Sequence, residues 1–196
     1  FIRTPQNSVQ KGELYLERIT KLIQEGKSTL ILTPDIAACR KMEKVLSPHF
    51  GDKIITYHSG QTTAKRREAT KALLTGNGEA SHPASEGTCH TIGTDTDTIC
   101  STGGDLHSPL VIIGLRSALF LPFRNLGLVI VDDEHSHLYK QSEPTPRYHG
   151  RDTALILAQL HNADIILSSS TPSFETLHNV MIGKYQEFTL PQEPSP

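Results

Sequence analysis

The chain has 196 residues, of which 19 are Lys or Arg and 21 are Asp or Glu, so its formal net charge is −2. This balance excludes a globally basic nucleic-acid coat but still allows a local basic face that grips phosphates. An odd count of three cysteines argues against a disulfide scaffold and fits a reducing cytosol, and the longest apolar stretch, Leu126–Val131, is far shorter than the roughly 20 residues that span a bilayer.

Short apolar runs rich in β-branched residues alternate with segments of helical periodicity. The runs lack polar alternation, which is typical of strands buried on both faces of a parallel sheet; they are Ser28–Thr33, Lys53–Tyr57, Leu110–Ile113, Leu126–Val131 and Asp164–Leu167. Helices are predicted at Glu13–Glu25, Ile36–Leu46, Thr63–Leu74 and Arg151–Leu160. Such alternation builds βαβ units, so we predict an α/β protein with a mostly parallel central sheet and helices on both faces.

The stretch from 76 to 108 interrupts this alternation. It consists mainly of Gly, Thr, Ser and Asp and contains no Lys or Arg, so it buries too little apolar surface to offset its ordering entropy. We expect a polar surface insertion within a lobe of residues 1–190. The insertion also contains His and Cys residues whose irregular spacing argues against a structural zinc site: His82, Cys89, His90, Cys100 and His107.

The two ends of the sequence predict that it is a piece of a larger protein. Phe1-Ile2-Arg3 has neither an initiator Met nor the charged and apolar regions of a secretory leader. The dense proline of residues 191–196 cannot continue a helix or a central strand, so this segment is expected to be a linker.

The strongest chemical signal is the run Leu128-Val129-Ile130-Val131-Asp132-Asp133-Glu134-His135. A buried strand that ends in consecutive acids places carboxylates at the C-terminal edge of a parallel sheet, where open α/β sheets bind ligands. Two such acids can hold Mg²⁺ and orient an attacking water, as phosphoryl transfer requires. The alternative is an acidic helix N-terminus that the helix dipole stabilises.

Three other predicted strands end in turns that offer hydroxyls, backbone amides or an Arg to the same edge. Each turn alone is more often structural than functional, but together with the acids they predict one shared surface. The turns are Leu32-Thr33-Pro34-Asp35, Gly114-Leu115-Arg116-Ser117-Ala118-Leu119-Phe120 and Ser168-Ser169-Ser170-Thr171-Pro172.

These motifs and their flanks resemble the primosomal protein N′ (PriA) replication-restart helicases. The resemblance covers nearly the whole chain except residues 76–108, and it rests on Gly114–Phe123, Asn125–His135, Tyr139–Gln141, Pro146–Asp152, Thr171–Glu175 and Gly183–Tyr185. It implies a RecA-like P-loop NTPase fold and the first motor lobe of a superfamily 2 helicase. The family's second motor lobe, DNA 3′-end-binding domain and zinc region are not in this chain.

The resemblance implies a site for ATP and Mg²⁺ with a degenerate phosphate-binding loop. It aligns Lys11 with the P-loop lysine and Gly12 with the threonine that binds Mg²⁺. Residues 5–10 lack the glycines that let backbone amides curl around phosphate. The lysine is therefore retained, whereas the loop and the metal-binding hydroxyl are lost.

The acidic motif carries the remaining implied chemistry. By resemblance, Asp132 binds Mg²⁺, and Asp133 and Glu134 activate the attacking water. Asp133 is one methylene shorter than the family's Glu, and a misplacement of about 1 Å can cost on the order of 10²-fold in rate. The other implied site residues are His135 in the catalytic motif and Ser169 and Thr171 in nucleotide binding.

The resemblance also implies a track for single-stranded DNA, in which Arg116 contacts phosphate. The expected DNA-binding residues are Pro34, Asp35, His58, Arg116, Ser117, Lys140, Arg147 and Tyr148. For the cluster around Arg147 and Tyr148, the sequence leaves a second interpretation open. The loop could instead pack on the lobe, with Tyr148 buried and Arg147 paired with Glu143.

The predicted function is the N-terminal motor lobe of an ATP-dependent 3′→5′ DNA helicase that acts in primosome assembly and replication restart. The resemblance implies single-stranded and forked DNA, primosome proteins and single-strand-binding proteins as partners, no membrane association, and a cytoplasmic, nucleoid-associated place in a bacterium. This lobe alone is expected not to unwind DNA, because a motor needs a second lobe to close the nucleotide cleft. The alternative is a catalytically inactive interaction module descended from a helicase, which the missing glycines and the shortened acid favour.

Overall fold

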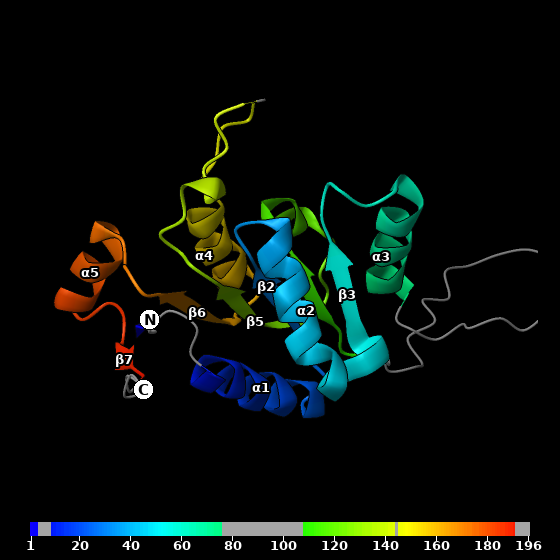
Figure 1. The fold of residues 1–196 in the computed structure, drawn as a ribbon, viewed down its shortest axis with the longest axis horizontal. Helices are drawn as coiled ribbons and strands as arrows, with labels where there is room; N and C mark the ends of the chain where they lie inside the picture. The colour runs from blue at the N-terminus through cyan, green and yellow to red at the C-terminus, as the bar shows by residue number, and fades with distance from the viewer. Residues whose placement is uncertain (4–8, 76–107, 144, 191–196) are drawn as a thin grey trace, which may run out of the picture.

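The computed structural model describes residues 1–3, 9–75, 108–143 and 145–190 (Figure 1). In these residues, strands form one sheet in the order β3-β4-β2-β5-β6-β1-β7, and each neighbouring pair is parallel. The strands are β1 (Ile2–Arg3), β2 (Ser28–Leu32), β3 (Ile54–Tyr57), β4 (Val111–Gly114), β5 (Leu126–Val131), β6 (Asp164–Ser169) and β7 (Phe188–Thr189). The predicted α/β class and the parallel sheet are confirmed.

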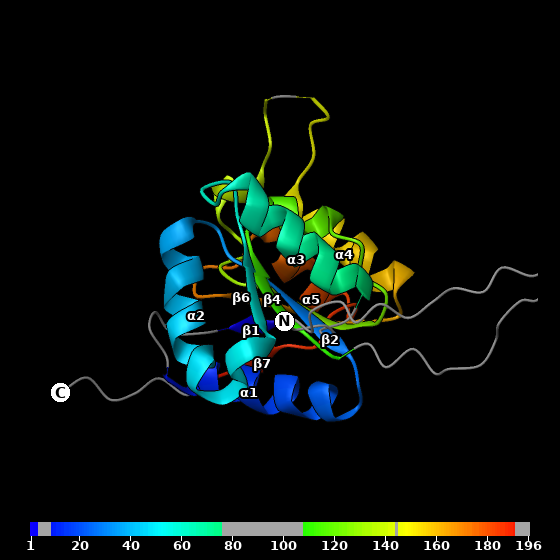
Figure 2. The same ribbon diagram turned by 90° about the vertical axis from the view of Figure 1, so that its right-hand side faces the viewer.

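Helices cover both faces of the sheet (Figure 2). On one face lie α1 (Val9–Gln24) and α2 (Ile36–Phe50), and on the other lie α3 (Thr63–Thr75) and α4 (Gly150–Leu160). The last helix, α5 (Phe174–Met181), follows β6. Short 3-10 helices occur at η1 (Gly51–Lys53), η2 (Arg116–Phe120) and η3 (His137–Tyr139). The predicted two-sided covering is confirmed.

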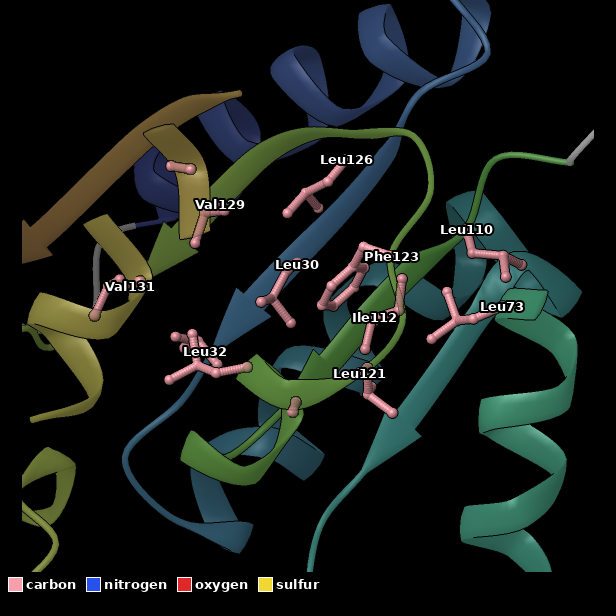
Figure 3. Packing of buried hydrophobic residues seen from close by; sticks show 14 of the residues in the cluster. Leu30, Leu32, Leu73, Leu110, Ile112, Leu121, Phe123, Leu126, Val129 and Val131 are labelled. Carbon is pink, nitrogen blue, oxygen red and sulfur yellow. The ribbon is translucent and has the colours of Figure 1, made fainter. Parts of the chain in front are cut away.

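Side chains of the central strands alternate between two apolar clusters. In β5, Leu128 and Ile130 pack in the cluster that α1 and α2 cover, whereas Val129 and Val131 point into the cluster beneath α4. Figure 3 shows the second cluster, where Phe123 lies among leucines of β2 and of the segment after β4. Because both faces of these strands are buried, their sequences are apolar without interruption.

The structure extends the predicted elements at several points. Helix α1 begins at Val9, four residues before the predicted start, so Lys11 and Gly12 lie in its first turn. Helix α2 continues past the predicted end at Leu46 and contains Pro48 in its last turn. The sequence did not predict β1, β7 or α5, because two-residue strands and an eight-residue helix are too short to show a periodicity.

Several sequence predictions fall outside the described residues. They concern most of the phosphate-binding loop, the polar insertion at 76–107 with its His and Cys residues, and the linker at 191–196. Within the described parts, no helix is both long enough and apolar enough to cross a membrane.

Candidate functional site

The C-terminal ends of β2, β4, β5 and β6 meet at one edge of the sheet. The backbone amide of Asp132, just after β5, donates to Leu32 O at 2.9 Å, and the amide of Thr33 donates to Gly114 O at 2.9 Å. The amide of Glu134 donates to Ser168 O of β6 at 3.0 Å. The predicted turns and the acidic run therefore lie side by side, as a parallel sheet requires.

Four side chains form what we call the Asp132 cluster: Lys11, Tyr15, Asp132 and Ser168. The ammonium of Lys11 contacts Asp132 Oδ1. The Ser168 hydroxyl lies 2.9 Å from the same oxygen, and the Tyr15 hydroxyl lies 3.3 Å from it. Tyr15 and Ser168 are fully buried, and Asp132 is only 6% exposed. The cluster thus joins the first two turns of α1 to the ends of β5 and β6.

Two buried tyrosine hydroxyls contact Asp132, one at its carboxylate and the other at its backbone carbonyl. Tyr15 approaches its carboxylate, while the Tyr139 hydroxyl donates to the backbone carbonyl of Asp132 at 2.6 Å and lies 3.0 Å from Leu32 O. Burial, followed by the negative charge of Asp132, raises the pKa of both phenols well above the ordinary value of 10. Both tyrosines therefore stay protonated and can act as hydrogen-bond donors at neutral pH.

Asp133 turns the chain away from the strand through a left-handed conformation. Its φ is +49°, a region that Asp tolerates better than most residues with a side chain. The side chain is partly buried, and burial together with the charge of Asp132 raises the pKa of its carboxyl. Asp133 is thus a partly exposed carboxylate with increased basicity next to the Asp132 cluster.

Glu134 is bound into a different group, the Glu134 cluster of Glu134, Arg151 and Ser173. Its Oε1 accepts the Ser173 amide at 2.8 Å, and its Oε2 accepts the Arg151 guanidinium at 3.2 Å and the Ser173 hydroxyl at 3.1 Å. Glu134 is 1% exposed. The structure therefore places Asp133 beside Asp132 but directs Glu134 towards the start of α5.

His135 and the predicted nucleotide residues of the turn after β6 also meet. The Nδ1 atom of His135 lies 2.6 Å from Ser169 Oγ, which also accepts the backbone amide of Thr171 at 3.0 Å. Ser169 is fully buried, so in this arrangement it connects His135 to the turn. Gly12 adds no side chain to the site, and a Cβ there would come no nearer than 3.6 Å to Val45.

The predicted DNA-binding residues divide into two groups. The first lies around η2 and the loop after η3. The Arg116 guanidinium donates to the carbonyls of Leu138 and Lys140, both at 3.1 Å, so it stabilises the loop after η3. Tyr148 packs edge to face on Phe120 with ring centroids 5.2 Å apart, while Arg147 is exposed. Tyr148 is partly buried, which agrees in part with the packed-loop interpretation.

The second group lies at the ends of β2 and β3. Asp35 caps α2, because its carboxylate accepts the Ala38 amide at 2.7 Å. Pro34 is partly buried in the preceding turn, whereas Ser117 belongs to the first group and is exposed in η2. His58 is 9% exposed, and its Nδ1 atom is a buried polar atom without a hydrogen-bond partner in the described structure. The structure does not bring this group into contact with the Asp132 cluster.

Sequence analysis missed several residues that build the site. Tyr15 lay within the predicted helix Glu13–Glu25 but was given no role of its own, and neither were Ser168, Tyr139 and Ser173. The position of Tyr15, four residues after Lys11 on α1, places both side chains on one helix face and was the available signal. The partners of Arg151 were not predictable, because Glu134 and Ser173 lie far from it in the sequence.

Comparison with known proteins gives a family relationship at this point. No protein-family model matches the chain. The replication restart protein PriA of Rickettsia conorii is 34% identical over 180 residues, which are 92% of this chain and 23% of that protein. The same protein of Haemophilus influenzae is 32% identical over 180 residues, or 92% of this chain and 20% of that protein.

The chain is homologous to a segment of replication restart protein PriA. It spans only about a fifth of the length of these curated relatives. A DEAD box protein from Methanococcus jannaschii has a similar fold, with a TM-score of 0.56 and 14% identity over 96% of this chain and 44% of that structure. The predicted RecA-like helicase fold of this PriA-related lobe is confirmed.

The residues of the Asp132 cluster fit a magnesium-bound nucleotide. Among the described residues, no group of three or more His, Cys, Asp or Glu side chains could hold a metal ion. Magnesium that arrives with a nucleotide needs only one or two carboxylates, because phosphates and water complete its coordination. Asp132 and Asp133 supply such carboxylates, and the ammonium of Lys11 lies at the same point.

Proposed function

We propose that the chain is a motor lobe of an ATP-dependent DNA helicase that acts in replication restart, with the Asp132 cluster as its nucleotide site. The contact between the Lys11 ammonium and Asp132 Oδ1 carries this proposal. A lysine in the first turn of a helix beside a carboxylate at a strand end is the pairing that P-loop enzymes use for phosphates and their metal. The homology to PriA supports the same reading.

Within this proposal, the residues of the edge have separate tasks. Lys11 binds the terminal phosphates and Asp132 holds Mg²⁺, which when bound neutralises charge on those phosphates. Asp133 orients the attacking water and accepts its proton, a task that its raised pKa supports. Glu134 fixes the backbone beyond Asp133 through Arg151 and Ser173. His135 and Ser169 connect this edge to the turn that contains Thr171.

The DNA track of the proposal lies at η2 and the loop after η3. Phe120 is 64% exposed beside Tyr148, and the basic side chains of Lys140 and Arg147 are exposed on the same loop. Aromatic faces with neighbouring cations suit single-stranded DNA, because bases stack while phosphates pair with the cations. Arg116 supports this loop in addition to its predicted phosphate contact.

The remaining features concern the whole protein. We propose 3′→5′ movement on single-stranded or forked DNA, contacts with primosome and single-strand-binding proteins, and a cytoplasmic, nucleoid-associated place in a bacterium. We further propose that the second lobe and a zinc region come from sequence outside this chain. The homology to a segment of PriA supports these assignments.

One observation favours a second candidate, a catalytically inactive DNA- or protein-interaction module. Gly12 occupies the position expected to offer a metal-binding hydroxyl, and it has no side chain. An eroded nucleotide site on a retained fold would still present the loop after η3 to DNA.

Calorimetric titration of Mg²⁺-ATP and Mg²⁺-ADP distinguishes the two candidates. The chain should bind both nucleotides, and Lys11→Ala should weaken binding at least tenfold because a phosphate contact is lost. Lys21→Ala is the matched control, since Lys21 is exposed on the same helix outside the Asp132 cluster. If the unaltered chain gives no heat with millimolar nucleotide, even after addition of the second lobe, the inactive module is the correct candidate.

A further inference from the structure

Ser168 is a fully buried hydroxyl that the proposed function has not used. It ends the apolar part of β6, and its Oγ lies 2.6 Å from the Tyr15 hydroxyl and 2.9 Å from Asp132 Oδ1. The three oxygens are contributed by α1, β5 and β6, so this small group joins three elements at the proposed nucleotide site.

The number of protons available determines the direction of these hydrogen bonds. An ionised carboxylate only accepts, and each of the two hydroxyls has one proton to donate. The arrangement that uses the two shortest contacts has Tyr15 donating to Ser168 and Ser168 donating to Asp132. The Tyr15 hydroxyl remains 3.3 Å from Asp132 Oδ1, too long to replace the Ser168 bond at equal strength.

Ser168, Tyr15 and Lys11 all approach the same oxygen, Asp132 Oδ1. Because a carboxylate is planar, contacts that hold one oxygen also restrict the position of the other. Gly12 follows Lys11 in the first turn of α1 and has no hydroxyl that could contact this oxygen. Ser168 is therefore the buried hydroxyl nearest to the carboxylate that the function assigns to the metal.

We propose that Ser168, held by Tyr15, is a positioning residue that orients Asp132 for a magnesium-bound nucleotide. This inference rests on the nucleotide site proposed above. A positioning residue of this kind affects nucleotide binding only when the metal is present, whereas a residue that merely supports the fold affects binding with and without metal.

The test measures ATP affinity of the chain in Mg²⁺ and in EDTA for Ser168→Ala, Tyr15→Phe and the control Ser170→Ala. Ser168→Ala should weaken binding in Mg²⁺ roughly tenfold, the size of a lost hydrogen bond to a charged group, and leave binding in EDTA unchanged. Tyr15→Phe should weaken it less, because Ser168 can still donate to Asp132. Thermal melts of each variant check that the fold persists.

Equal losses in Mg²⁺ and EDTA, or no loss at all, would overturn the role of Ser168 while leaving the nucleotide site intact. Failure of the unaltered chain to bind ATP, even after addition of the second lobe, would overturn both proposals together.

Discussion

Asp132 and Glu134 lie two residues apart just after β5, but they have different ion-pair and hydrogen-bond partners. Each is a buried acid with one cationic partner, Lys11 for Asp132 and Arg151 for Glu134. Arg151 lies at the start of α4 and binds Glu134 together with Ser173, so both carboxylate oxygens have partners. Lys11 contacts Oδ1 of Asp132, and its side chain is 19% exposed.

Because of this difference, the Glu134–Arg151 pair suits a structural role, whereas at Asp132 an incoming phosphate could replace the carboxylate as the partner of Lys11. The Glu134 cluster ties β5 to the starts of α4 and α5, and its guanidinium fork is well suited to a fixed geometry. The Asp132 cluster has a flexible ammonium that an incoming phosphate can attract and two hydroxyls that stay in place. We therefore propose that, of the two acids of this short motif, Glu134 has a structural role and Asp132 a nucleotide-binding role.

The largest effect is expected from Arg151→Met. Removing the guanidinium leaves Glu134 buried without its cation, and breaking a buried pair from one side costs about 3–5 kcal/mol of unfolding free energy. Urea denaturation measures the loss. Glu175→Gln is the control, because Glu175 is exposed and lies 3.7 Å from Arg151, so this change should shift the urea midpoint far less than Arg151→Met. A cost below about 1 kcal/mol for Arg151→Met would contradict the structural role of the Glu134 cluster.

Compared with Arg151→Met, Asp132→Asn should lower the unfolding free energy less and the nucleotide affinity more. The new amide oxygen can still accept from Ser168, and the freed ammonium of Lys11 can reach solvent, so we expect a loss of about 1–2 kcal/mol. Binding of Mg²⁺-ATP should fall at least tenfold in the same variant. The comparison between the clusters would be wrong if Asp132→Asn destabilised the chain as much as Arg151→Met.

Gly12→Ala should stabilise the chain by about 0.5–1 kcal/mol, because it removes a glycine from a helix where a Cβ has room. Urea midpoints of the two chains give the change. A higher unfolding free energy would show that glycine at position 12, next to the proposed site, destabilises the first turn of α1. A loss would indicate that the backbone at Gly12 needs a conformation closed to alanine.

The smallest effect concerns Cys39, a residue of α2 whose buried thiol lies in the same apolar cluster as Tyr15. Burial raises the pKa of this thiol from 9.0 to about 11. A raised pKa favours the protonated thiol in the folded state, so its contribution to stability is complete below about pH 9 and is lost as the pH rises towards 11.

Alkylation of Cys39 then reports on opening of the apolar cluster that α1 and α2 cover, in a chain whose other two cysteines are changed to Ser. At pH 8 the thiol should react only as fast as the chain opens. Asp132→Asn should raise the rate slightly, and Arg151→Met should raise it in proportion to its larger loss of stability. Fast alkylation of a chain without either of these substitutions would contradict the burial of Cys39.

The sequence predicted the layers of the fold because its strongest signals were long. Leu126–Val131 and Glu13–Glu25 are apolar patterns that only a buried strand and a one-sided helix explain. It could not predict β1, because Ile2–Arg3 is a strand only through its pairing with Ser168–Ser169 and Phe188–Thr189. Short edge elements of this kind depend on neighbours that are remote in the chain.

The sequence by itself determined which carboxylates stand at this edge of the sheet, because Asp132 and Glu134 directly follow a buried strand. Lys11 lies before the predicted helix and was aligned with the site only by the family resemblance. The run from 132 to 135 does not itself distinguish the two acids, and their different roles were implied only by the family resemblance. Only the tertiary structure assigned Lys11, Tyr15 and Ser168 to one and Arg151 to the other. Partner choice depends on which side chains the packing of α1, α4 and β6 brings within hydrogen-bond distance, and that packing is fixed by the whole core.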